Sequence, residues 1–151
     1  MEIIVNRIIS KIQIFILAAL MTSAVSCGGG KYKDIKGFIN EVVAAQDEFL
    51  SKIEASVNAG DAVSAVQVFG DRLVKLSEKS KEIKKKYPEI DQWIENPPAD
   101  LKEDLAKLDN TGSRFEQVFF KENVKRIIKD KQVQTAFIEL NKKMESVKFF
   151  Q

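Results

Sequence analysis

The stretch Val57-Asn58-Ala59-Gly60-Asp61 decides the fold, because it separates two long runs of helical periodicity with almost no chain between them. Gly60 suits the left-handed position that follows a helix, and Asp61 is a good cap for the next helix. So short a connection turns the second helix straight back along the first. The sequence therefore predicts an antiparallel helical hairpin around residue 60.

Apolar residues recur at alternating steps of three and four on both sides of this turn, which places them along one face of each helix. The second helix is expected over residues 62–87, where Pro88 ends it. The first begins at the predicted cap Asp34, and its apolar positions are Ile35, Phe38, Ile39, Val42, Val43, Phe49, Ile53 and Val57.

The same spacing predicts a third helix after Pro97 and Pro98, with Asn96 as its cap. Its apolar positions are Leu101, Leu105, Leu108, Gly112, Phe115 and Phe119. Residues 109–113 have the composition of a loop, but Gly112 keeps the helical phase. We interpret this region as one continuous helix in which Gly112 lets a neighbour approach, at a cost of about 1 kcal/mol relative to alanine.

The phase changes near residues 121–123, so a bend is expected there. Asp130 is the next cap, and the last helix uses Val133, Phe137, Leu140, Met144 and Val147. Phe149 and Phe150 are expected to cover an open end. The predicted fold class is all-α, an antiparallel bundle of about four amphipathic helices. A coiled coil between chains is the alternative, and the short turn near residue 60 favours packing within one chain.

The composition argues against catalysis and metal binding. The chain has no histidine, and so lacks the commonest general base and the commonest metal ligand. Its single cysteine cannot form an intramolecular disulfide. Without the three charged residues of 1–26, the totals of 24 basic and 22 acidic residues fall to 22 and 21. We expect no enzyme, no cofactor, no metal site and no nucleic-acid partner.

Some polar residues still need an interpretation. The acidic pairs Asp47/Glu48 and Glu103/Asp104 do not share a helix face, because adjacent residues point about 100° apart, and Glu116 and Glu122, six residues apart, do not share one either. Gln46 and Ser80 interrupt apolar stripes. They either make hydrogen bonds within the core or meet each other or a small ligand.

An apolar stretch from Ile12 to Met21 follows Arg7 and Lys11. About ten residues match the core of a signal peptide and fall short of the roughly 20 that span a bilayer. A retained signal anchor is the alternative. Small residues precede Cys27 at the positions that signal peptidase requires, so we predict cleavage after Ser26.

The residues Ala24-Val25-Ser26-Cys27 resemble the lipobox of bacterial lipoproteins, with Ala24 where that family usually has leucine. The resemblance covers residues 1–27 only. It implies that Cys27 becomes an acylated N-terminus, carrying diacylglycerol and a palmitate-type chain that anchors the protein in the cell envelope. By resemblance to the sorting rules of enteric bacteria, the outer membrane is implied, since no acidic residue stands directly after Cys27.

These segments divide the chain into a signal peptide (1–26), a lipidated cysteine with a glycine-rich tether (27–33) and a helical domain (34–151). The leading functional hypothesis is a non-catalytic interaction module that binds an envelope or host protein. A carrier of a small apolar ligand between the helices is the second, based on Phe38, Phe49, Phe69, Phe115, Phe119 and Phe137, with Gly112 leaving room. A purely structural envelope protein is the third. The oligomeric state is left open.

Overall fold

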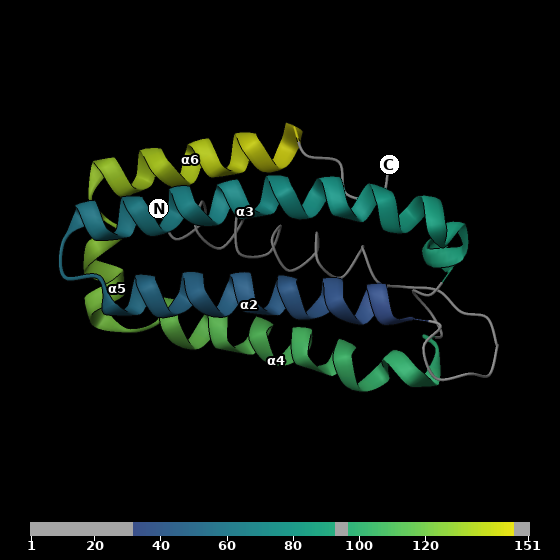
Figure 1. Cartoon of the computed structure of the whole chain (residues 1–151). Helices are drawn as coiled ribbons and strands as arrows, with labels where there is room; N and C mark the ends of the chain where they lie inside the picture. Colours follow the sequence, from purple (N-terminus) through teal and green to yellow (C-terminus); the bar gives the residue numbers. More distant parts are fainter. Residues whose placement is uncertain (1–31, 93–96, 147–151) are drawn as a thin grey trace.

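A computed structural model of the chain describes residues 32–92 and 97–146 (Figure 1). Its long helices are α2 (Lys33–Ala55), α3 (Ala59–Lys86), α4 (Lys102–Phe119) and α6 (Lys131–Ser146). The short ones are η1 (Pro88–Gln92), η2 (Ala99–Leu101) and α5 (Glu122–Ile127). Every regular element in the described ranges is a helix, and the helices pack on one another, which confirms the all-α prediction.

The turn between α2 and α3 is capped differently from the prediction. Asn58, and not Asp61, caps α3, because its Oδ1 accepts a hydrogen bond from the backbone N–H of Asp61 at 3.0 Å. The Asp61 carboxylate in turn accepts the backbone N–H of Val57 at 3.2 Å. This reciprocal capping starts α3 at Ala59, three residues before the predicted Ala62.

Gly60 lies inside the first turn of α3, so the prediction that it ends the preceding helix is wrong. A Cβ atom at Gly60 would lie 3.1 Å from Asn58 Oδ1, and the glycine therefore leaves room for the cap. Val57 was placed on the apolar stripe, but α2 ends at Ala55 and the Val57 side chain is 81% exposed.

The folded part begins earlier than the predicted boundary between tether and domain. Tyr32 is the residue before α2, and its side chain is buried with the ring centre 6.2 Å from that of Tyr87. Asp34, expected as the cap, lies in the first turn of α2 instead. The two tyrosines therefore close the end of the bundle at which the chain enters.

Polar pairs along the sides of α2 show the direction of its neighbours. Asp34, Glu41 and Glu48 pair with Lys86, Lys79 and Arg72 in that order, so α3 runs antiparallel to α2. Asn40, Asp47 and Glu54 bond to Lys107, Arg114 and Lys121, each 67 residues later, so α4 runs parallel to α2. The hairpin prediction is confirmed, and the parallel pair was not predicted.

Consecutive long helices alternate in direction, but α4 lies against α2, and α6 lies parallel to α3 and against it (Figure 1). Lys143 of α6 pairs with Asp71 of α3 at 2.6 Å, and Leu140 packs on Gly70. Helix α3 ends at Lys86, and α4 begins at Lys102 and packs on α2 as well. The predicted antiparallel arrangement therefore holds for α2 and α3, but the pairs α2–α4 and α3–α6 are parallel.

The predicted course of the second half of the chain is otherwise confirmed. Helix α4 continues through Gly112, although Thr111 is buried and Gly112 is only half-buried, so the buried stripe is rotated from the prediction. The chain bends between Phe119 and Glu122. Asp130 caps α6 by accepting the backbone N–H of Gln132 at 2.8 Å. The expectations for Asn96, Val147, Phe149 and Phe150 concern residues outside the described ranges.

Five buried phenylalanines connect the long helices at the core. Phe49 of α2 stacks on Phe69 of α3, with ring centres 4.4 Å apart. It also contacts Phe115 and Phe119 of α4 at 6.0 and 6.4 Å. Phe119 reaches Phe137 of α6 at 6.1 Å. Aromatic pairs of this kind contribute about 0.5–1.5 kcal/mol each beyond the burial of their surface, so this cluster holds all four helices together.

Candidate functional site

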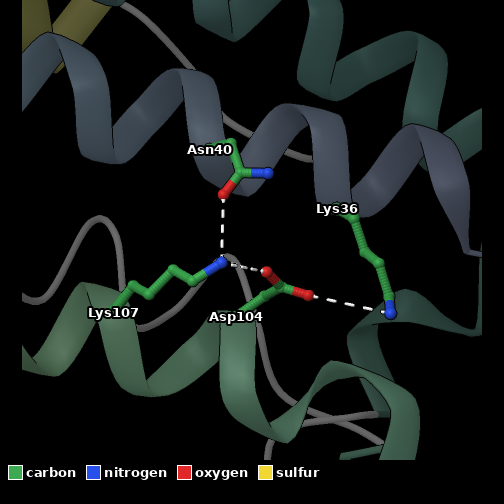
Figure 2. A network of polar contacts seen from close by, with 4 residues as sticks. All are labelled: Lys36, Asn40, Asp104 and Lys107. Atoms are coloured by element: carbon green, nitrogen blue, oxygen red, sulfur yellow. Dashed lines mark hydrogen bonds and ion pairs between the residues drawn. The ribbon is translucent and has the colours of Figure 1, made fainter.

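Asp104 of α4 is a buried carboxylate, 8% exposed, at the contact of α4 with α2. Its Oδ1 accepts a hydrogen bond from Lys107 Nζ at 2.6 Å, and its Oδ2 lies 3.8 Å from Lys36 Nζ (Figure 2). Lys107 Nζ also donates to Asn40 Oδ1 at 3.4 Å. These four residues form a closed polar network that ties the first half of α2 to α4.

The electrostatics of this network favour a role in holding α2 against α4 over a role in proton transfer. The hydrogen bond from Lys107 to Asp104 raises the pKa of Lys107 above its ordinary value of 10.5. Lys107 therefore stays protonated at neutral pH and cannot serve as a base. The two oxygens of Asp104 face two cations, Lys107 of the same helix and Lys36 of α2. We interpret the network as structural.

The sequence did not single out Asp104 for burial, although a signal was available. Asp104 lies three residues after Leu101 and four before Leu108, and both leucines are buried. This spacing places all three on one helix face. The predicted apolar stripe passed through the neighbouring Leu105, and so Asp104 was not recognised as a buried position.

The other acidic pairs do not converge on a site. Asp47 pairs with Arg114 of α4, and its neighbour Glu48 pairs with Arg72 of α3, both at 2.6 Å. Glu103 points to solvent beside the buried Asp104, and Glu116 and Glu122 are both exposed. Within the described ranges, no three side chains of the metal-binding types come together.

Gln46 and Ser80 do not meet. Ser80 is fully buried and donates its hydroxyl to the carbonyl of Ser77 at 2.7 Å, as expected for a hydrogen bond within the core. Gln46 is 3% exposed, and its Oε1 accepts no hydrogen bond from the described residues. Unsatisfied buried oxygens cost about 1–3 kcal/mol, so Gln46 is a weak point of the core.

The part of the phenylalanine stripe that lies between α2 and α3 is filled by side chains. Phe49 and Phe69 fill the space with their own rings. The depression beside them, on the α2–α3 contact, is lined by Ala45, Glu48, Lys52, Ala65, Val68 and Arg72, and is too shallow to admit a water molecule.

The end of the bundle at α5 exposes apolar side chains. Val57 is 81% exposed and Phe120 is 64% exposed. Both lie near Glu54, whose carboxylate pairs with Lys121 and whose carbonyl accepts the Asn123 amide at 3.2 Å. We call Val57, Phe120 and α5 the bundle-end surface. The sequence contained no signal for it, because consecutive residues of a helix can both be buried, as Phe49 and Leu50 are in α2.

The remaining predicted site residue, Cys27, lies outside the described residues. Among those residues, no helix has the length and apolarity needed to cross a membrane. No protein-family model matches the chain, and no curated protein or solved structure matches it either.

Proposed function

We propose that this chain is a lipid-anchored protein of the bacterial cell envelope that acts as a non-catalytic interaction module. In this proposal, residues 1–26 are removed as a signal peptide and Cys27 carries the lipid. The glycines at 28–30 form the tether, and a bundle of four long helices is held at the outer membrane. The bundle then binds another envelope protein or a host protein.

The observation that supports this proposal best is the difference between the two ends of the bundle. The chain enters α2 at Lys33, beside the end of α3, where Lys86 pairs with Asp34. Helix α2 has 23 residues and extends about 34 Å to the other end. There Val57 and Phe120 are exposed. A module tethered by one end presents the other to its partners, and exposed apolar side chains favour binding there.

The two alternatives have less support. A carrier needs interior space, and the stacked rings of Phe49 and Phe69 fill the contact between α2 and α3. A purely structural envelope protein needs no exposed apolar surface at a bundle end. The interaction module is the hypothesis that uses the exposed residues.

The anchor is tested by intact mass spectrometry of the protein from its native membrane, beside a Cys27→Ala variant. We expect the wild type to begin at residue 27 and to gain the mass of diacylglycerol and one acyl chain. The variant should lose that mass and leave the membrane fraction. An unmodified wild type, or unchanged membrane retention of the variant, would exclude Cys27 as the anchor.

The binding role is tested with a photo-reactive phenylalanine analogue at position 120 in intact cells. We expect a discrete cross-linked partner from this position. The same analogue at Lys75, an exposed residue in the middle of α3, is the control and should give none. Cross-links of equal yield from both positions, or none from either, would count against an interaction module that uses this end.

A further inference from the structure

We draw no further inference here: the strongest candidate, the exposed stripe of small residues Gly37, Ala44 and Ser51 that runs along α2 between its polar pairs with α3 and those with α4, carries none because nothing in the described part of the chain shows what covers it.

Discussion

The two contacts that α2 makes with its neighbours share one chemistry and differ in how the chain reaches them. The adjacent residues Asp47 and Glu48 illustrate this, because Asp47 pairs with Arg114 of α4 and Glu48 with Arg72 of α3 at the same distance of 2.6 Å. On both sides, polar pairs recur every seven residues along α2. Only three residues connect α2 to α3, whereas residues 87–101 separate α3 from α4 in the sequence.

This difference shows which part of the fold is locally encoded. The α2–α3 contact follows from the Asn58 cap and a short connection, which leave an antiparallel hairpin as the simple solution. The α2–α4 contact depends on packing between distant segments, and its parallel direction is set by the phenylalanine cluster and by Asp104. Removing a residue shared by both contacts should therefore cost most.

The largest effect is expected for Phe49→Ala. Phe49 contacts Phe69 across the α2–α3 contact, and Phe115 and Phe119 across the α2–α4 contact. Deleting a buried phenylalanine side chain costs about 3–5 kcal/mol. Chemical denaturation followed by circular dichroism should show a fall of that size in the free energy of unfolding.

The matched control is Phe120→Ala, which removes the same atoms from a side chain that is 64% exposed. It should cost about 0.5 kcal/mol or less. Similar losses for the two variants would mean that Phe49 does not join the two contacts as the structure indicates.

A smaller effect, confined to the α2–α4 contact, is expected for Asp104→Asn. The change keeps the shape of the side chain and removes the charge that Lys36 and Lys107 share. Hydrogen bonds to charged groups contribute about 1.5–3 kcal/mol when buried. Because both lysines are about two-fifths exposed, we expect a loss nearer 1 kcal/mol in the free energy of unfolding. Asp109→Asn, at an exposed position of the same helix, should change it much less, and equal effects would contradict a buried network.

How much of the fold the sequence predicts follows the same division. Periodicity is a local property, so it placed α3, the continuous α4 through Gly112, and the bend after Phe119. It missed the cap at Asn58 because asparagine and aspartate cap helices equally well, and both stand at this turn. Periodicity could not identify the neighbours of α4. A stripe of apolar residues indicates that a helix face is buried, but it does not indicate which helix packs against that face.

The candidate site was predictable to a smaller extent. The prediction that Asp47 and Glu48 do not converge is confirmed. Of the interpretations left open for Gln46 and Ser80, the hydrogen bond within the core holds for Ser80. The exposure of Phe120 depends on where α4 ends, which Phe119 and Phe120 alone do not specify. Cys27 stays a prediction, since it lies outside the described residues.

The smallest effect is expected in the dependence of stability on pH, which compares the α2–α3 contact with the α2–α4 contact. On the α2–α3 contact, the hydrogen bond from Lys86 lowers the pKa of Asp34. The pKa of Glu48 is lowered mainly by the hydrogen bond from Lys52 of the same helix and then by the charge of Arg72 of α3. On the α2–α4 contact, Lys121 lowers the pKa of Glu54. The unfolded chain therefore takes up these protons first, near the ordinary pKa values of 3.8 and 4.5. Their stabilisation is complete above those values and is lost as pH falls through the folded pKa values.

The melting temperature should be flat above about pH 5 and fall below it, less steeply in high salt. Asp34→Asn on the α2–α3 contact and Glu54→Gln on the α2–α4 contact should each flatten the profile, and an unchanged profile in either variant would contradict the ion pair at that contact.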